Sequence, residues 1–342
     1  MTLHAVILAG GRGTRLAPLT DRTPKPLLPV AGLPVVAHQL VMLAALDVSR
    51  VLLTTSYRAQ QFRDVLGTGG AWGLELDYCR EDAPLGTGGA LAAAVDRLAP
   101  ANGDVLLVLN GDQLSAHDVA AQLNAFAAVR SRLGAVGTLH AKPVADARAY
   151  GLIEVGAAGR ITAFREKPEE LVGGIVNAGT YLLDPSCLDG VSRRQPVSFE
   201  RDVIPALLRA GGVLTAYVED AYSMDIGTPA TLIAASRDAV LRHGPAIIDP
   251  AASVDPSARV RDGSYVGPGA VIAANCDVRG TIVMARARLD AGVLADSCAF
   301  GPGAQVDGPA SLHDVVLGAH AYVGAGHPLR PGARVPTAAI LR

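Results

Sequence analysis

The sequence predicts an α/β domain built on a largely parallel sheet, followed by a parallel β-helix of short strands. Up to residue 243, apolar runs typical of strands alternate with segments of helical periodicity, which is the pattern of βαβ units. Beyond that point apolar residues recur every six positions, a period that fits the faces of a β-helix. We therefore expect an α/β domain at residues 1–243 and a hexapeptide-repeat β-helix at residues 244–342.

The composition narrows the class of protein. A length of 342 residues exceeds what one core usually supports, in agreement with two domains. The net charge of −2 gives no sign of a nucleic-acid or membrane surface. The four cysteines lie far apart without a C-x-x-C pair, which favours reduced thiols over a disulfide frame. No apolar run reaches the length of a membrane span, so we expect a soluble, cytoplasmic protein.

Local patterns predict each element of the first domain. Pro34 opens a helix, because its missing N–H costs little in the first helical turn. The run 104–110 is apolar on both faces, as expected of a central strand in a parallel sheet. Ser198 is the expected N-cap of a helix at 198–209. The other expected strands are 5–8, 50–55, 74–79, 135–140, 150–154, 161–168, 175–183 and 213–218, and the other expected helices are 59–66, 116–129 and 229–241.

Residues 8–30, LAGGRGTRLAPLTDRTPKPLLPV, follow the first strand and have the features of a phosphate-binding loop. Their three glycines let successive backbone N–H groups turn toward an anion. The dinucleotide fingerprint G-x-G-x-x-G is excluded because Leu16 stands at the third glycine position, and no Gly-Lys-Ser/Thr of a Walker A loop follows. The glycines are Gly10, Gly11 and Gly13, and the cations beside them are Arg12, Arg15, Arg22 and Lys25.

Three further features point to a ligand at the same edge of the sheet. A second glycine-rich loop, EDAPLGTGGA at residues 81–90, would let the backbone approach a flat base. The central strand ends in Gly111-Asp112, and ligands of parallel sheets gather at the carboxyl ends of strands, so Asp112 is expected beside a metal–phosphate complex. Finally, the chain has three lysines against 27 arginines, which makes each lysine more informative.

The series G-G-x-G-T-R-L-x-P-L-T and P-K-P-L-L-P resembles the signature of the sugar nucleotidyltransferases, or NDP-sugar pyrophosphorylases. These enzymes join a nucleoside triphosphate to a sugar 1-phosphate and release pyrophosphate. The stretches P-L-G-T-G-G, I-T-A-F-R-E-K-P and D-I-G-T-P resemble further segments of the family, so the resemblance covers about residues 3–240. It implies a Rossmann-like mixed sheet, a left-handed β-helix, and guanylyl transfer, with GTP and mannose 1-phosphate as the expected substrates.

The resemblance also implies the roles of particular residues. Arg15 would hold the pyrophosphate, Lys25 the α-phosphate and Lys167 the attacking sugar phosphate, and Asp112 and Asp225 would hold one Mg²⁺. The expected catalytic residues are therefore Arg15, Lys25, Asp112 and Lys167. The expected nucleotide-binding residues are Leu8, Ala9, Gly10, Gly11, Gly13, Thr14, Arg15, Glu81, Pro84, Gly86, Thr87 and Gly88. The expected sugar-phosphate-binding residues are Gly151, Glu166, Lys167 and Asn177.

The six-residue period predicts about five coils of roughly 18 residues each. We expect this part to mediate homo-oligomerisation, as in many members of the family. The predicted inward residues are Ile248, Val254, Val260, Val266, Ile272, Val278 and Met284, then Leu294, Phe300, Val306 and Leu312, then Leu317, Val323, Leu329, Val335 and Leu341.

Several alternatives stay open. The substrate could be another nucleotide, or a heptose or cyclitol phosphate, because related loops occur in enzymes that use them. A non-catalytic homologue that binds a nucleotide sugar and controls a partner is the rival from another class. Some β-helices in the family carry an acyltransferase, which would need a histidine base such as His313, His320 or His327. Ser223-Met224 also replaces the aromatic residue that often precedes the second metal-binding aspartate.

Overall fold

The computed structural model describes residues 2–46, 48, 50–81 and 83–342. The chain folds into two compact units: unit 1 holds the chain up to Gly11 together with Gln39–Ser223, and unit 2 holds Arg12–His38 and Met224–Arg342. The strands of the β-helix begin at Ala246, close to the predicted position 244. Because unit 2 also contains residues 12–38 and 224–243, the grouping in space does not follow the order of the chain.

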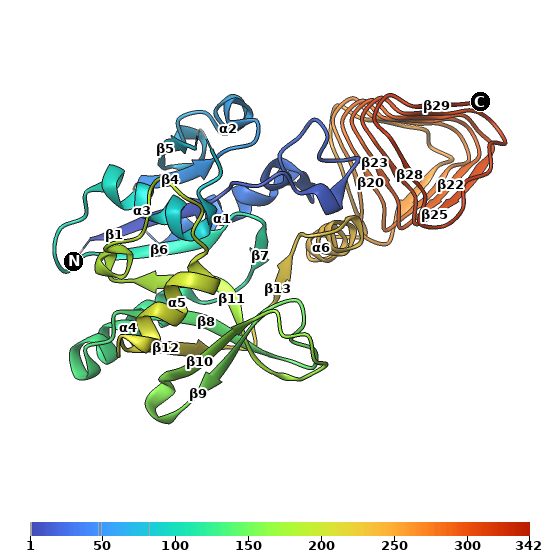
Figure 1. Cartoon of the computed structure of the whole chain (residues 1–342). Coiled ribbons are helices and arrows are strands. Elements are labelled where there is room, and N and C mark those ends of the chain that lie inside the picture. The colour runs from blue at the N-terminus through green and yellow to red at the C-terminus, as the bar shows by residue number, and fades with distance from the viewer. Residues whose placement is uncertain (1, 47, 49, 82) are drawn as a thin grey trace. The chain divides into compact units, whose positions relative to one another are not determined.

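Unit 1 is organised around a mixed nine-stranded sheet, as predicted (Figure 1). The strand β1 (Leu3–Leu8) lies between β4 (Arg50–Thr55) and β6 (Val105–Asn110) and is parallel to both. Beyond β4 lies β5 (Glu75–Arg80), and beyond β6 lies the antiparallel β11 (Gly174–Leu183). The sheet continues through β9 (Gly151–Val155), β10 (Ile161–Glu166), β8 (Gly137–Val144) and β12 (Leu214–Val218). The strands are apolar because their side chains form a continuous core, in which Val6, Leu52, Leu106, Val108 and Tyr181 are fully buried.

The helices agree with the predicted pattern, with two differences. The stretch predicted as a second glycine loop is, from Gly86 onward, the first turn of α3 (Gly86–Leu98), because the run Ala90–Ala94 consists of helix formers. Residues 113–115, which no predicted element covers, form the short strand β7 (Gln113–Ser115). The other helices are α1 (Val35–Ala45), α2 (Ala59–Leu66), α4 (Val119–Leu133), α5 (Ile204–Arg209), which a π-turn at Phe199–Val203 precedes, and α6 (Pro229–Leu241).

Short elements connect these parts. Single 3₁₀ turns lie at Thr14–Leu16, Lys25–Leu27, Gly70–Trp72, Ala157–Gly159 and Pro185–Leu188. Two-residue strands β2 (Pro29–Val30) and β3 (Leu33–Pro34) pair with each other, and β13 (Ser223–Asp225) precedes α6. Ser198 caps its helix as predicted, since its Oγ accepts a hydrogen bond from the Arg201 N–H at 3.1 Å.

The C-terminal part is a β-helix with three parallel sheets, drawn in orange to red in Figure 1. Its architecture agrees with the left-handed hexapeptide type that the family resemblance implied. The first sheet contains β14 (Ala246–Ile248), β17 (Ser264–Val266), β20 (Ile282–Val283), β23 (Ala299–Phe300), β26 (Val316–Leu317) and β28 (Arg334–Val335). The second contains β15 (Ser253–Val254), β18 (Val271–Ile272), β21 (Arg288–Leu289), β24 (Gln305–Val306), β27 (Tyr322–Val323) and β29 (Ile340–Leu341). The third contains β16 (Arg259–Arg261), β19 (Asp277–Arg279), β22 (Val293–Asp296) and β25 (Ala310–His313).

The register corrects two of the predicted inward positions. Val266 pairs with Val283, which pairs with Phe300, so the middle coils contain 17 residues rather than 18. The inward row therefore runs through Val283 where the strict period predicted Met284. In the third sheet the inward residue is Ala295, and the predicted Leu294 is 48% exposed. The reason is that one face of a coil can lose a residue at its corner, which shifts the pattern by one position and turns the next side chain to the other face.

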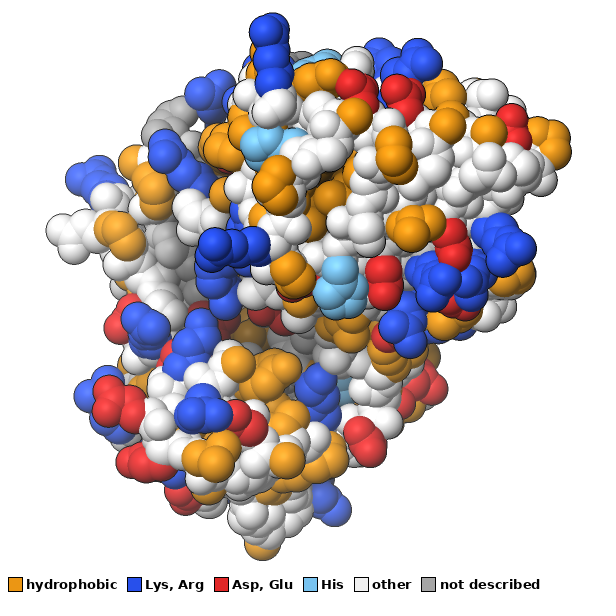
Figure 2. All heavy atoms as spheres, turned by 90° about the vertical axis from the view of Figure 1, so that its right-hand side faces the viewer, with side chains coloured by type: hydrophobic (Ala, Val, Ile, Leu, Met, Phe, Trp, Pro, Cys, Tyr) orange, Lys and Arg blue, Asp and Glu red, His pale blue; other side chains and the backbone are white. Residues whose placement is uncertain are grey.

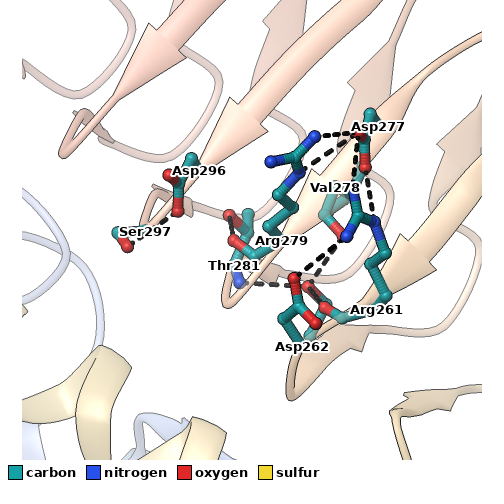
Figure 3. Close-up of polar contacts among 9 residues, drawn as sticks. Arg261, Asp262, Asp277, Val278, Arg279, Thr281, Asp296 and Ser297 are labelled. Atoms are coloured by element: carbon teal, nitrogen blue, oxygen red, sulfur yellow. Dashed lines mark hydrogen bonds and ion pairs between the residues drawn. The ribbon is translucent and has the colours of Figure 1, made fainter.

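An ion-pair ladder lies along the third sheet of the β-helix (Figure 3). The Asp277 carboxylate accepts hydrogen bonds from Arg261, at 3.0 and 3.1 Å, and from Arg279, at 2.6 and 3.1 Å. These two guanidinium groups hold the pKa of Asp277 well below its usual range. Figure 2 shows acidic and basic side chains lying next to each other on the face that it views, rather than a patch of one sign.

Candidate active site

Unit 1 contains a cavity of about 340 Å³ at the carboxyl ends of β1 and β6, in the size range of small-ligand pockets. The pairing of Leu8 with Asn110 brings the two strand ends together. Sequence analysis predicted most of the lining, since only Ala90 and Asn110 were not among the expected residues. The lining consists of Leu8, Gly10, Gly11, Glu81, Pro84, Gly86, Thr87, Ala90, Asn110 and Asp112.

Glycines bring the backbone close together at this edge. The Gly111 N–H donates to the Leu8 carbonyl at 2.9 Å, and a Cβ at Gly111 would lie 2.8 Å from that oxygen. The Gly11 N–H donates to Ser56 Oγ at 3.3 Å. Because Gly111 fixes the end of β6, the half-buried Asp112 lies on the cavity lining, where the strand-end argument predicted it.

Glu81 supplies a carboxylate to the same cavity. Its Oε2 accepts a hydrogen bond from the Leu85 N–H at 3.0 Å, which fixes the side chain. Burial raises the pKa of Glu81. A carboxylate in such partly dry surroundings is a strong acceptor for the N–H groups of a bound base.

Five predicted nucleotide-binding residues lie outside the cavity lining: Gly13, Thr14 and Arg15, which belong to unit 2, and Ala9 and Gly88, which belong to unit 1. The Ala9 N–H donates to the Thr54 carbonyl, and the Gly88 N–H donates to the Val197 carbonyl at 2.8 Å. Both therefore support the backbone of the loops, and their contact with a nucleotide stays a prediction. Thr87 lines the cavity, but its hydroxyl group donates to Glu200 Oε2 at 2.7 Å and accepts from the Phe199 N–H at 2.8 Å.

The predicted sugar-phosphate residues lie on neighbouring antiparallel strands. Glu166, at the end of β10, pairs with Gly151, at the start of β9. A Cβ at Gly151 would lie 2.3 Å from the Phe164 ring and 3.0 Å from Glu166 Oε2, so a side chain at position 151 would displace both. Lys167 Nζ lies 3.6 Å from Glu166 Oε1, and burial is the main cause that raises the pKa of Glu166. The predicted set is thus assembled around a half-buried carboxyl group.

Glu200 is a site residue that sequence analysis missed. The Asn177 Nδ2 donates to the Tyr181 hydroxyl at 2.7 Å, and that hydroxyl donates to Glu200 Oε1 at 3.2 Å. Through Glu200 the predicted sugar-phosphate-binding residue Asn177 is connected to Thr87 of the cavity lining. Nothing in the local sequence distinguishes Glu200 from any other acid in a first helical turn, so its role becomes visible only when β11 and α3 are placed beside it.

Unit 2 brings three other predicted residues together. Lys25 Nζ lies 3.4 Å from Asp225 Oδ1, with 12% of the lysine side chain and 45% of the aspartate side chain exposed. A Cβ at Gly227 would lie 3.0 Å from Asp225 Oδ2 and 3.1 Å from Arg15 Nη2, so both groups flank this glycine. The signature loop thus folds against the D-I-G-T-P segment as the resemblance implied.

Local hydrogen bonds explain why these segments are fixed. Thr228 and Thr231 form a reciprocal capping box at the start of α6, and the Gly227 N–H donates to Thr231 Oγ1 at 3.1 Å. Gly13 adopts a φ of +61°, and a Cβ there would lie 3.0 Å from the Lys25 Cβ, so glycine is required beside the lysine. Thr14 begins the 3₁₀ turn that carries Arg15. Asp112 belongs to unit 1 and Asp225 to unit 2, so one ion shared by both stays a prediction.

The chain belongs to the nucleotidyl transferase family, whose model matches residues 4–240. The chain is similar to the mannose-1-phosphate guanylyltransferase of Mycobacterium tuberculosis, with 37% identity over 86% of this chain and 83% of that protein. It is also similar to the catalytic subunit beta of the Drosophila melanogaster mannose-1-phosphate guanylyltransferase, with 35% identity over 76% of this chain and 71% of that protein.

Solved structures show the same fold over about 70% of the chain. HddC from Yersinia pseudotuberculosis is 29% identical with a TM-score of 0.58, covering 69% of this chain and 98% of that one. A putative glucose-1-phosphate thymidylyltransferase from Bacillus anthracis is 26% identical with a TM-score of 0.61, covering 70% of this chain and 95% of that one. None of the helices in the described part of the chain combines the length and the hydropathy that a membrane span requires.

Proposed function

We propose that this protein transfers the guanylyl group of GTP to mannose 1-phosphate and releases pyrophosphate. The observation that carries the proposal is the convergence of Arg15, Lys25 and Asp225 from distant segments, since these are the charged residues that the family signature assigns to phosphate chemistry. The substrates come from the relatives, which are named as mannose-1-phosphate guanylyltransferases and match most of this chain. A nucleotide-sized cavity with an acidic group at its edge supports the choice of a base rich in N–H donors.

The reaction needs positioning and charge neutralisation rather than a protein nucleophile. A phosphate oxygen of the sugar 1-phosphate attacks the α-phosphorus of the triphosphate, the bond to the β-phosphate oxygen breaks, and pyrophosphate leaves. Both reactants are anions, so cations must lower their repulsion. Lys25 would neutralise the α-phosphate, Arg15 would hold the departing pyrophosphate with two parallel hydrogen bonds, and Lys167 would hold the attacking phosphate.

Base and sugar would be read by separate groups. Glu81 would accept from the N1–H and the exocyclic amine of guanine, while Gly86 and Pro84 would allow the ring to lie flat against the backbone. Glu166 and Asn177 would bond sugar hydroxyl groups, and Glu200 would hold Asn177 through the Tyr181 hydroxyl. Gly151 would leave room for the sugar at backbone distance.

Asp112 and Asp225 fit a magnesium ion by their chemistry. Both are carboxylates that solvent can reach, one on the cavity lining and the other with 45% of its side chain exposed, and Mg²⁺ prefers one or two carboxylates together with phosphate oxygens. When bound, the ion would supply positive charge to the phosphate oxygens. Lys25 would then exchange its contact with Asp225 for a contact with the substrate phosphate.

A pyrophosphate-release assay with four nucleoside triphosphates and several sugar 1-phosphates tests the substrates. We expect the highest kcat/KM for GTP with mannose 1-phosphate in the presence of Mg²⁺. A pyrimidine triphosphate as the best substrate would reject the guanine assignment, and a heptose or cyclitol phosphate would replace mannose. If no pair releases pyrophosphate but the protein binds a nucleotide sugar, the regulatory homologue is the correct interpretation.

Single variants test the assigned roles. Lys25→Ala should lower kcat by about two to three orders of magnitude, as expected for the loss of one charge-stabilising donor. The matched control is Arg148→Ala, which removes an exposed cation that pairs with the nearby Asp146 and should leave kcat unchanged. Equal rates for both variants would remove Lys25 from the mechanism.

The β-helix is proposed to join copies of the chain. This proposal rests on the family resemblance, since the exposed apolar side chains Ile340, 62% exposed, and Leu294, 48% exposed, lie on different sheets of the β-helix. Light scattering during gel filtration should give a mass above one chain. A monomer at micromolar concentration would contradict this part of the proposal.

A further inference from the structure

The last coil of the β-helix contacts the loop that carries Arg15. Both belong to unit 2, and the segment from Arg12 onward, blue in Figure 1, meets the β-helix there. Arg334 Nη1 donates a hydrogen bond to the Arg15 carbonyl at 3.1 Å. Thr337 Oγ1 donates to Asp21 Oδ2 at 2.8 Å. The β-helix therefore holds both ends of the segment formed by residues 15–21.

The sequence of the loop explains why it needs a donor from outside. The N–H groups of Leu16 and Ala17 each donate to the carbonyl three positions earlier, as in a 3₁₀ turn. The same pattern would satisfy the Arg15 carbonyl from position 18, but Pro18 has no N–H. The loop cannot supply this donor by continuing its own turns, and the guanidinium group of Arg334 supplies it instead.

The β-helix presents Arg334 and Thr337 from a rigid coil. Val335 is 3% exposed and belongs to the inward row, so the neighbouring Arg334 points outward from β28. The adjacent coil packs closely, since a Cβ at Gly318 would lie 2.6 Å from the Thr337 nitrogen. The Gly318 N–H also donates to the Val335 carbonyl at 2.9 Å. The two donors are therefore fixed by the packing of neighbouring coils.

The loop held in this way carries charged residues of the proposed phosphate chemistry. The Arg15 side chain and the Asp225 carboxylate flank Gly227, and Lys25 contacts Asp225. A guanidinium group that holds an anion with two parallel hydrogen bonds depends on its orientation. A shift of the Arg15 backbone would therefore weaken the grip on the anion, even with the side chain itself unchanged.

We propose that Arg334 and Thr337 are positioning residues for pyrophosphate, and that the last coil of the β-helix is a structural part of the phosphate site. The inference rests on the proposed function, in which Arg15 holds the departing pyrophosphate. Arg334 and Thr337 act through the backbone that carries Arg15 rather than by touching the substrate. The β-helix then has a role within each chain, separate from the joining of copies.

The reverse reaction tests this role, because pyrophosphate is then a substrate. The rate of GTP formation from GDP-mannose and pyrophosphate gives a KM for each reactant. Arg334 is exposed and water can replace part of its bond, so Arg334→Ala should raise the KM for pyrophosphate about five- to tenfold and change the KM for GDP-mannose by less than about twofold. A variant that had merely lost folded protein would instead show a lower kcat and two unchanged KM values.

Three further variants make the test specific. Arg334→Lys keeps a charged donor and should restore part of the affinity for pyrophosphate. Thr337→Val keeps the shape of the side chain without its hydroxyl donor, and should also raise the KM for pyrophosphate. The matched control is Arg330→Ala, which removes an exposed arginine four positions before Arg334 and should leave both KM values unchanged.

Calorimetry with inorganic pyrophosphate and Mg²⁺ separates this inference from the proposed function, since it needs no turnover. If the wild type consumes no GDP-mannose but Arg334→Ala binds pyrophosphate more weakly than the wild type, the proposed substrates fail and the positioning role stands. Equal dissociation constants for the wild type and Arg334→Ala would overturn the inference. So would a wild type that binds no pyrophosphate, or an equal loss of affinity in Arg330→Ala.

Discussion

Replacing Tyr181 by phenylalanine removes one hydroxyl group and tests whether the contacts around Glu200 hold the site together. The ring is completely buried and packs edge-on against Phe199, with the ring centres 5.2 Å apart, and phenylalanine preserves this contact. The hydroxyl accepts from Asn177 at 2.7 Å and donates to Glu200 at 3.2 Å. The variant therefore separates the hydrogen bonds from the packing.

The expected loss of stability follows from these two bonds. A neutral hydrogen bond contributes about 1 kcal/mol and one to a carboxylate about 1.5 to 3 kcal/mol. Asn177 and Glu200 are only half-buried, so water can replace part of what is lost. We expect the free energy of unfolding to fall by about 1 to 2 kcal/mol, and the KM for mannose 1-phosphate to rise by up to about tenfold, because Asn177 loses its fixed orientation.

Urea unfolding and steady-state kinetics measure the two effects. The matched control is Tyr78→Phe, whose hydroxyl donates to the Gly67 carbonyl at 2.6 Å on the surface of unit 1. This control should leave the KM unchanged. If Tyr181→Phe changes neither the stability nor the KM, or if the two variants behave alike, then the contacts of Glu200 do not position the sugar residues.

Three other predictions test separate parts of the fold. The Arg97 guanidinium group holds the pKa of Asp77 at about 2, and Arg50 lies 3.2 Å from the same carboxylate. These contacts therefore stabilise the folded protein fully above pH 4, and this stabilisation is lost as the pH falls from 4 to 2. Because both arginine side chains are about half exposed, we expect this stabilisation to be about 1 kcal/mol. The difference in urea midpoint between the wild type and Asp77→Asn should vanish near pH 2. Gly86→Ala would place a Cβ 2.5 Å from the Val197 carbonyl oxygen at a φ of +70°, so it should lower the free energy of unfolding by about 1 to 3 kcal/mol. The loss should exceed that of the control Gly67→Ala, where φ is +63° and the space is open. Equal losses would show that only backbone strain matters. Thr337→Val removes the 2.8 Å hydrogen bond that joins the last coil of the β-helix to Asp21 Oδ2. Amide hydrogen exchange in residues 12–22 should therefore accelerate by up to about tenfold. The control Tyr322→Phe, which changes a contact within the β-helix, should leave this exchange rate unchanged.

Much of the site could be predicted from the sequence because its chemistry is carried by short contiguous stretches. Gly10, Gly11 and Asp112 line the cavity at strand ends, as the alternation of apolar strands and glycine turns indicated. The proximity of Lys25 to Asp225 agrees with the family resemblance, although 200 residues separate them. These agreements in position depend on local signals or on a family motif, and the binding roles of the residues stay predictions.

Features that depend on the meeting of distant segments could not be read in the same way. Glu200 looks like any acid in a helical turn until β11 and α3 bring Tyr181 and Thr87 to it. His117, His140 and Glu219 are spread over about a hundred residues and form a cluster only where β8, β12 and the start of α4 meet. The glycines of residues 86–89 look like a loop, but they form the first turn of α3, where a Cβ at Gly86 or Gly88 would crowd the Val197 carbonyl.

By itself the sequence determined the two kinds of architecture, and it singled out the glycine-rich loop and the charged residues of the signature as the predicted phosphate site. Periodicity and glycine placement are local properties, since they follow from backbone hydrogen bonding and from which face of an element is apolar. Only the tertiary structure decided the one-residue slip of the β-helix at Val283, the role of Glu200 and the cluster of stacked histidines. Each of these depends on close packing between elements far apart in the chain, where a single side chain or a single residue of register selects the partner.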